Sequence, residues 1–230
     1  MKNTLINKEI IKKVAATLGN LNDEVVYVGG ATVSLYINDP AADDVRPTKD
    51  IDISLQILSI PQLEEIRQQL IEKGFSQSAD LGVICRFKLD DILVDVMSTK
   101  AVGWAPANPW FANGFDLRET IVIDGVKIQI MPLSYFLASK FSAFKDRGGT
   151  DPRMSKDLED ITYILDNRTD WHEVLVKASN NVQEFLKTCL QEILESAKLQ
   201  EAMKGFLFYE GQDERFNIIF KKIEHVINQT

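Results

Sequence analysis

Apolar side chains recur along this chain with two different periods. Residues 8–18 carry them at helical spacing, with Asn7 as the expected N-cap. The apolar run 25–28 then meets Gly29-Gly30 and a second apolar stretch, 31–37. This pattern predicts a helix, followed by a strand, a tight turn and another helix.

The next segment predicts a strand and then a helix. Residues 50–57 alternate polar and apolar positions, as a half-buried strand does. A helix is expected to begin at Pro61 and to continue to residue 73, where Gly74 ends it.

Two hairpins are expected further along the chain. The β-rich runs 83–89 and 92–98 are separated by two aspartates, which suggests the first hairpin. The runs 120–123 and 126–130 flank Asp124-Gly125, a preferred two-residue hairpin turn.

Residues 99–118 join these hairpins and hold prolines, glycines and two tryptophans. Long loops without secondary structure are usually functional or mobile. The aromatic side chains either pin this loop onto the core or belong to a lid over a substrate, and the sequence leaves both readings open.

From residue 132 onward, the apolar residues follow helical spacing. Segments 132–146 and 152–167 are expected to be helices, the second with Asp151 as its N-cap, and helices continue to the C-terminus. We therefore predict an α/β (α+β) domain over residues 1–131, with a small mixed sheet flanked by helices. An α-helical domain is predicted over residues 132–230.

Composition limits the function classes. Apolar residues make up 45% of the chain, as in a globular protein with a core. Cys85 and Cys189 offer neither a disulfide framework nor a metal knuckle, which favours a reducing cytoplasm. Charges interrupt the N-terminal apolar residues, and no apolar run approaches the roughly 20 residues of a membrane helix. The net charge of −8 argues against broad contact with a nucleic-acid backbone.

Three aspartates form the first half of a candidate site. Strand alternation places Asp50 and Asp52 on one face, and Asp95 is an isolated charge inside a later apolar run. Converging carboxylates repel one another, and a buried one needs a positive partner. A divalent cation meets both needs, because Mg²⁺ prefers oxygen ligands and is commonly shared with substrate phosphates. We predict that all three are catalytic and bind Mg²⁺ or Mn²⁺, with Asp95 helping to deprotonate the attacking hydroxyl.

Gly29-Gly30 supplies the second half of the candidate site. Without a Cβ, a glycine pair lets the backbone approach an anion, and the amides of the following helix point toward it. We expect the β- and γ-phosphates of a nucleoside triphosphate such as ATP there, with a plain tight turn as the alternative.

Three short motifs therefore occur together, namely Val28-Gly29-Gly30, Arg46-Pro47-Thr48-Lys49-Asp50-Ile51-Asp52 and Val94-Asp95-Val96. This combination resembles the DNA polymerase β-type nucleotidyltransferase superfamily, although that superfamily often has Gly-Ser in place of the glycine pair. The Arg-x-Thr-x-Asp-x-Asp form resembles its AbiEii/MenT-like branch, found among toxins of bacterial toxin–antitoxin and abortive-infection systems. The later basic and acidic motifs of that branch are matched here by Lys140, Arg147 and Lys156–Asp160.

The resemblance covers roughly residues 25–165. It implies transfer of a nucleoside monophosphate from the triphosphate to a hydroxyl of RNA, tRNA or protein, with an antitoxin protein as a further partner. It also implies nucleotide contacts from both domains, at Gly29, Gly30, Arg46, Thr48, Lys140, Asp157 and Asp160. The helices after Trp171 match nothing in the family, and we expect them to decide the acceptor.

Lys140 also stands out on helical periodicity. It lies on the same stripe as Phe136 and Phe141, so its cation faces the apolar side. Buried lysines are uncommon and need an anion, for which the triphosphate is the preferred reading and snorkelling to solvent the alternative. Asp157 and Asp160 share a helix face, and they orient Lys140, bind a base or ribose, or form helix pairs.

Other chemistries fit the sequence less well. Residues 29–34 lack the second and third glycines of the Gly-x-Gly-x-x-Gly dinucleotide fingerprint. No Gly-x-Ser-x-Gly elbow occurs, and His172 and His225 lie far apart in the helical part, which leaves hydrolase and zinc chemistry unsupported. Two alternatives stay open: transfer to a small molecule such as an antibiotic, and a catalytically silent nucleotide-binding module.

Overall fold

The computed structural model describes residues 2–48, 50–77, 85–147 and 151–229. The chain divides into a sheet unit, residues 1–34 and 43–132, and a helical unit, residues 35–42 and 133–230. The hydrophobic pattern does not reveal that residues 35–42 group with the helices. Lys49 of the aspartate motif and residues 83–84 of a predicted strand lie outside the described residues.

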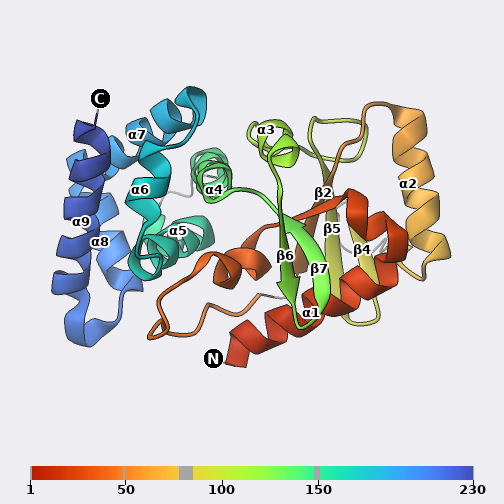
Figure 1. Ribbon diagram of the computed structural model, residues 1–230, viewed down its shortest axis with the longest axis horizontal. Coiled ribbons are helices and arrows are strands. Elements are labelled where there is room, and N and C mark those ends of the chain that lie inside the picture. The colour runs from red at the N-terminus through yellow and green to blue at the C-terminus, as the bar shows by residue number, and fades with distance from the viewer. Residues whose placement is uncertain (1, 49, 78–84, 148–150, 230) are drawn as a thin grey trace. The chain divides into compact units, whose positions relative to one another are not determined.

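Within the described residues, the sheet unit contains one mixed sheet of seven strands in the order β3-β4-β5-β2-β1-β7-β6 (Figure 1). The strands are β1 (Val25–Val28), β2 (Asp50–Leu55), β3 (Ser76–Gln77), β4 (Arg86–Leu89), β5 (Ile92–Ser98), β6 (Glu119–Ile123) and β7 (Val126–Ile130). β2 and β5 run parallel, as do β1 and β7, whereas β1 and β2 are antiparallel. The predicted mixed sheet flanked by helices is confirmed.

Helix α1 (Lys2–Leu18) begins well before the predicted start at residue 8. Asp44 caps its first turn from a distant loop, because it accepts hydrogen bonds from the backbone amides of Asn3 at 2.6 Å and Thr4 at 2.9 Å. Such amides have no partner within a helix. The prediction that Asn7 is the N-cap was therefore wrong, and Asn7 is buried inside the helix.

Helices connect several strands of the sheet unit, namely η1 (Gly19–Glu24), η2 (Gly30–Tyr36), α2 (Ile60–Glu72) and α3 (Phe111–Asp116). The helix predicted over residues 31–37 is the 3₁₀ helix η2, in which the Thr32 hydroxyl donates to the Gly29 carbonyl at 2.9 Å. Helix α2 ends as predicted before Gly74, whose φ is +94°. The segment predicted as a plain loop over residues 99–118 contains α3.

Both predicted hairpins form. β4 and β5 pair across a turn in which Asp90 has a φ of 52°. β6 and β7 pair across Asp124 and Gly125, whose φ values are 47° and 87°. Two successive positive φ values define the tight hairpin turn that an Asp-Gly pair favours, and this turn matches the twist of the strands it joins.

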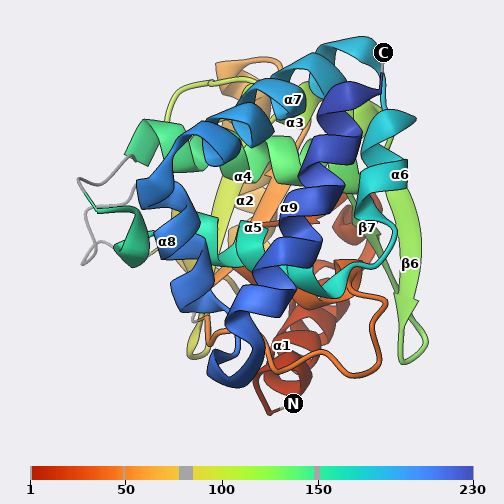
Figure 2. The same cartoon turned by 90° about the vertical axis from the view of Figure 1, so that its left-hand side faces the viewer.

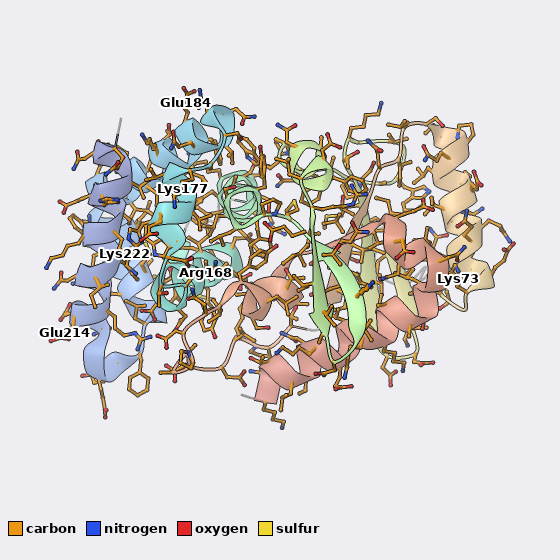
Figure 3. The ribbon with its side chains drawn as sticks, in the orientation of Figure 1. Lys73, Arg168, Lys177, Glu184, Glu214 and Lys222 are labelled. Carbon is orange, nitrogen blue, oxygen red and sulfur yellow. The ribbon has the colours of Figure 1, made fainter. Side chains whose placement is uncertain are left out.

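The helical unit contains α4 (Leu133–Arg147), η4 (Pro152–Met154), α5 (Lys156–Asn167), α6 (Trp171–Val176), α7 (Asn180–Glu195), α8 (Ala197–Phe206), η5 (Tyr209–Gly211) and α9 (Gln212–Asn228) (Figure 2). The predicted C-terminal helical region is confirmed. Exposed charged side chains such as Lys177, Glu184 and Glu214 cover the outer helix faces (Figure 3). Of the helices that the structure describes, none combines the length and apolar character that crossing a membrane requires.

The helix predicted over residues 152–167 is interrupted. Asp151 caps only the short η4, accepting from the amide of Arg153 at 3.1 Å. Ser155 has an extended backbone and caps α5, because its hydroxyl accepts from the amide of Leu158 at 3.3 Å. Serine competes well for this role, since its hydroxyl satisfies an amide that the helix leaves free.

Candidate active site

The three predicted aspartates lie on one face of the sheet. β2 and β5 run parallel with Asp52 directly opposite Asp95. Residues opposite each other in paired strands point to the same side, as do alternate residues of one strand, so Asp50 shares this side. Asp50 and Asp52 are half-buried, and Asp95 is 8% exposed. Ile51 and Ile53 are buried on the opposite side. The surface formed by the three aspartates is called the acidic face.

Gly29 brings the turn after β1 against the acidic face. Its φ of +76° lies in the left-handed region that favours glycine. A Cβ placed on Gly29 would lie 1.8 Å from Oδ2 of Asp52, so only glycine leaves room for that carboxylate. Val28 lies directly opposite Asp52 in the β1–β2 ladder, and Gly30 begins η2. The structure thus joins the glycine turn to one of the predicted acids.

Arg86 on β4 is a residue of this face that the sequence reading missed. It lies directly opposite Asp95 in the antiparallel β4–β5 pair. Its Nε donates to Oδ1 of Asp95 and its Nη2 to Oδ2, both at 2.6 Å. Nη2 also lies 3.5 Å from Oδ2 of Asp50. The hydrogen bonds to Asp95 raise the pKa of the Arg86 guanidinium, which supplies the positive partner that a buried carboxylate needs.

Thr48 and Arg46 precede β2 in the predicted motif. The Thr48 hydroxyl donates to Oδ1 of Asp50 at 2.8 Å and thereby fixes the orientation of that carboxylate. Arg46 is half-buried, and its Nη1 donates to the carbonyl of Pro47 at 3.4 Å. Thr48 therefore contacts the acidic face directly.

The acidic face has the donor type of a hard-cation site, because Mg²⁺ and Mn²⁺ take carboxylate oxygens. Among the described residues, no group of three or more Asp, Glu, His or Cys side chains is close enough to hold one metal ion. Both oxygens of Asp95 are bonded to Arg86. Magnesium is commonly held by one or two carboxylates together with substrate phosphates, so Asp50 and Asp52 fit such an ion by their chemistry.

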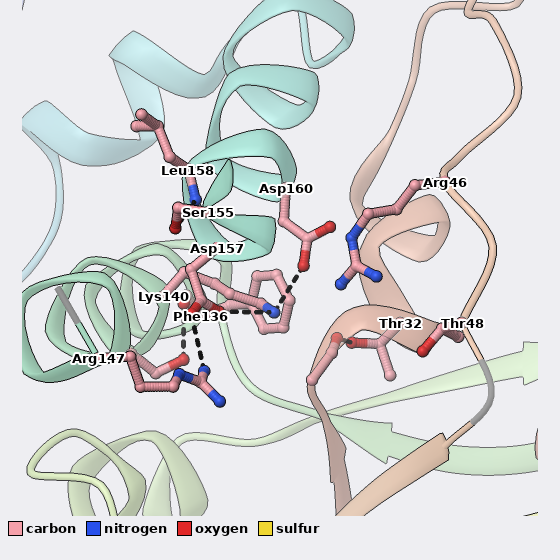
Figure 4. A network of polar contacts seen from close by, with 12 residues as sticks. Thr32, Arg46, Thr48, Phe136, Lys140, Arg147, Ser155, Asp157, Leu158 and Asp160 are labelled. Atoms are coloured by element: carbon pink, nitrogen blue, oxygen red, sulfur yellow. Dashed lines mark hydrogen bonds and ion pairs between the residues drawn. The ribbon is translucent and has the colours of Figure 1, made fainter. Parts of the chain in front are cut away.

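Lys140 is a buried member of a cluster of charged residues in the helical unit (Figure 4). Its side chain is 8% exposed, and its Nζ lies 2.7 Å from Oδ2 of Asp160 and 3.5 Å from Oδ1 of Asp157. The same Nζ lies 5.8 Å from the centre of the Phe136 ring. Arg147 places Nη2 2.8 Å from the second oxygen of Asp157. The group of Lys140, Arg147, Asp157 and Asp160 is called the lysine cluster.

The lysine cluster decides between readings of Lys140. Snorkelling to solvent was wrong, because the side chain is buried against Phe136. Of the three roles weighed for Asp157 and Asp160, orienting Lys140 agrees with these contacts. The two cations and two carboxylates balance in formal charge, and contact of these residues with a triphosphate stays a prediction.

The two histidines are neighbours in space, although they are far apart in the sequence. The ring centres of His172 on α6 and His225 on α9 lie 5.5 Å apart. The prediction that they lie far apart was therefore wrong. Burial lowers the pKa of His172, and the charges of Lys222 and His225 lower it further. The described part of the chain adds no further ligands that would make a three-ligand metal group here.

Aromatic side chains anchor the segment after β5. The Trp104 indole donates to Oε1 of Glu64 at 3.1 Å, and its ring centre lies 5.7 Å from that of Phe87. Phe111 and Phe115 of α3 are buried. These contacts favour the anchoring role over that of a substrate lid.

The architecture is shared with solved structures. An antigenic nucleotidyltransferase-like protein from Paracoccidioides brasiliensis is similar with a TM-score of 0.51 and 20% identity, over 86% of this chain and 92% of that one. The antibiotic-resistance factor ANT(2'')-Ia is similar with a TM-score of 0.50 and 13% identity, over 83% of this chain and 96% of that one. This chain has the nucleotidyltransferase fold.

At these identities the likeness concerns the fold alone. No model of a known protein family matches the chain, and no curated protein matches it in sequence. The nucleotidyltransferase fold is the scaffold that carries the acidic face, and the chemistry of that face depends on its own residues.

Proposed function

We propose that this protein is a metal-dependent nucleotidyltransferase, which moves a nucleoside monophosphate from a nucleoside triphosphate to a hydroxyl acceptor. The observation that carries the proposal is the acidic face, in which carboxylates of two parallel strands share one side and Gly29 abuts Asp52. The nucleotidyltransferase fold supports the same class of reaction.

The proposed reaction is an in-line displacement at the α-phosphorus. The acceptor oxygen forms a bond to that phosphorus, the bond to the bridging oxygen of the β-phosphate breaks, and pyrophosphate leaves. Asp95 takes the proton of the acceptor hydroxyl on a carboxylate oxygen. Asp50 and Asp52, together with Asp95 where an oxygen of it exchanges Arg86 for the ion, would hold Mg²⁺ or Mn²⁺, which stabilises the charge of the phosphate oxygens when bound. Thr48 keeps Asp50 in place through its hydrogen bond.

The backbone of the Gly29-Gly30 turn is proposed to face the triphosphate. Because Gly29 has no Cβ, the main chain approaches the acidic face closely there. Arg46 and the residues of the lysine cluster Lys140, Asp157 and Asp160 stay predicted nucleotide contacts. Substituting these residues one at a time would show whether nucleotide binding depends on them as well as on the aspartates.

The proposed acceptor is an RNA, a tRNA or a protein, and the proposed setting is a toxin of a toxin–antitoxin or abortive-infection system. The support is the spacing of Arg46, Thr48, Asp50 and Asp52, which resembles the AbiEii/MenT-like branch. A small antibiotic is the alternative acceptor, which the net charge of −8 favours.

Transfer is tested with each of four α-labelled nucleoside triphosphates, Mg²⁺ or Mn²⁺, and three acceptor sets: total RNA, the protein itself, and an aminoglycoside and lincosamide panel. Asp52→Asn is expected to lose labelling of whichever acceptor the wild type modifies. Asp91→Asn is the matched control, because Asp91 is exposed in the β4–β5 turn. Absence of labelling by the wild type in every combination would leave the silent binding module as the better reading.

The toxin setting has its own test. Induced expression of the wild type in a bacterial host is expected to arrest growth, whereas Asp52→Asn at the same protein level is expected to permit it. Equal growth of the two cultures would remove the toxin role and leave the transfer reaction to the labelling assay.

A further inference from the structure

Arg86 is placed by the sheet itself, not by a flexible loop. It is the first residue of β4, and its Cα is the register partner of Asp95 on β5. The backbone amide of Val96 donates to the carbonyl of Cys85 at 2.9 Å and holds the two strands together beside this pair. The backbone register therefore places Arg86 beside Asp95 of the acidic face.

The contacts of Arg86 join two strands of the acidic face. A guanidinium that binds both oxygens of a carboxylate is the strongest side-chain pairing for that group, and Arg86 binds Asp95 in this way at 2.6 Å through each nitrogen. Its Nη2 also lies 3.5 Å from Asp50 on β2. The side chain of Arg86 is 18% exposed and that of Asp95 is 11% exposed, so solvent screens this pair only in part.

The charges explain why such an arginine is present. Asp50, Asp52 and Asp95 carry three formal negative charges side by side, and Arg86 returns one positive charge. Without it, repulsion among the carboxylates would oppose folding of this face. With it, these four side chains sum to two formal negative charges.

We propose that Arg86 is the internal counter-ion of the acidic face and competes with a divalent cation for Asp95. This proposal rests on the proposed function, because it concerns the same carboxylates. A cation that takes an oxygen of Asp95 meets the positive guanidinium at short range, so metal binding and the Arg86–Asp95 pair oppose each other. Arg86 thereby stabilises the metal-free protein and sets how much metal is needed to load it. It is a positioning residue and needs no contact with substrate.

The test measures binding of Mn²⁺ alone to the purified protein, by electron paramagnetic resonance of the free ion and by calorimetry. Arg86→Gln is expected to bind Mn²⁺ at least about tenfold more tightly, because a unit charge close to the ion is removed. Its melting temperature without metal is expected to fall, and saturating Mn²⁺ is expected to restore more of it than in the wild type. Arg86→Lys keeps the positive charge but loses the bidentate contact with Asp95. Its affinity for Mn²⁺ is expected to lie between those of the wild type and Arg86→Gln.

Arg67→Gln is the matched control, because Arg67 pairs at 2.6 Å with Glu64, which lies three residues before it on α2. It is expected to leave Mn²⁺ affinity unchanged. Equal or weaker Mn²⁺ binding by Arg86→Gln, relative to the wild type, would overturn the counter-ion role. A purely structural arginine would lower the melting temperature on removal without tightening metal binding.

Failure of the proposed function gives a different result. If the wild type transfers no nucleotide, while Arg86→Gln still tightens Mn²⁺ binding and Asp52→Asn abolishes it, the counter-ion role stands and transfer falls. If the wild type transfers nucleotide and Arg86→Gln leaves Mn²⁺ affinity unchanged, the reaction stands and the counter-ion role falls.

Discussion

The acidic face and the lysine cluster use the same residue types in different proportions. The acidic face sets three aspartates against one arginine, and the side chain of Asp50 remains 40% exposed. The lysine cluster sets two aspartates against Lys140 and Arg147, and the side chain of Asp160 is only 2% exposed. The first group keeps negative charge and access to solvent, whereas the second is balanced and, at its centre, closed.

This difference sets a half-exposed group with excess negative charge apart from a group whose central charges are buried. A buried ion pair is stable only while both partners are present, because each alone carries the desolvation cost. Uncompensated negative charge on partly exposed carboxylates instead favours binding of a cation, and functional sites often contain such groups. Substitutions in the two groups should therefore fail in different assays.

The largest effect is expected for Asp95→Asn in the transfer assay. The amide keeps the size of the side chain and a hydrogen bond to Arg86 but cannot take the acceptor proton. We expect the rate of transfer to fall about 10³-fold, equivalent to about 4 kcal/mol of activation free energy. The variant is expected to remain folded, as its melting curve would show. A rate within threefold of the wild type would remove Asp95 from the chemistry.

Asp160→Asn should show the reverse profile. Removing one partner of a buried pair leaves the charge of Lys140 short of compensation, and we expect about 3 kcal/mol less stability in urea unfolding. Asp213→Asn is the control, since Asp213 pairs with Lys204 at the same 2.7 Å distance but on the surface. It should cost less than about 1 kcal/mol. Similar losses for the two variants would show that the lysine cluster is no tighter than a surface pair.

Gly29→Ala should have an intermediate effect, which lowers both the stability of the protein and the binding of Mn²⁺ at the acidic face. The left-handed backbone disfavours any side chain by about 1–2 kcal/mol, and the new methyl would overlap Asp52. Gly125→Ala shares the positive φ, but a Cβ there meets nothing within 4 Å. We expect Gly125→Ala to lose stability only, and Gly29→Ala to lose both stability and Mn²⁺ binding. Unchanged Mn²⁺ binding by Gly29→Ala would separate the glycine turn from the aspartates.

The smallest effect is expected from pH in the helical unit. The pKa of His172 in the folded protein is lowered by burial and then by Lys222 and His225, so the unfolded chain binds its proton first. Stability should therefore fall as pH drops below about 6.5, the usual histidine value. His172→Gln should flatten the stability curve between pH 7 and 5.5, as measured by urea unfolding at each pH. An unaltered slope would assign that pH dependence to other groups.

Local signals in the sequence were sufficient wherever partners are close along the chain. Asp124-Gly125 defined its hairpin because two residues with positive φ suffice for that turn. Alternation placed Asp50 and Asp52 together because their strand has one buried side. The register of β4 and β5 also follows from their turn, since counting outward from Asp90 and Asp91 pairs Arg86 with Asp95.

Distant partners account for what the sequence did not reveal. Asp44 caps α1 from a loop that no local pattern connects to it. The approach of His172 to His225 depends on how α6 packs on α9. Lys140 was correctly expected to need an anion, but periodicity cannot say whether that anion is a ligand or an aspartate of the same unit. In each case the deciding contact depends on tertiary packing.

The capping contact of Asp44 gives the first turn of α1 a reach beyond its own helix. Asn3 and Thr4 donate hydrogen bonds to the Asp44 carboxylate. The side-chain amide of Asn3 also donates to the carbonyl of Val45 at 2.8 Å. A few residues further along the chain, the Thr48 hydroxyl donates to Asp50 of β2. Unwinding a single N-terminal turn, by a fused tag or a protease, would thus release Asp44 and loosen the segment that leads toward the acidic face.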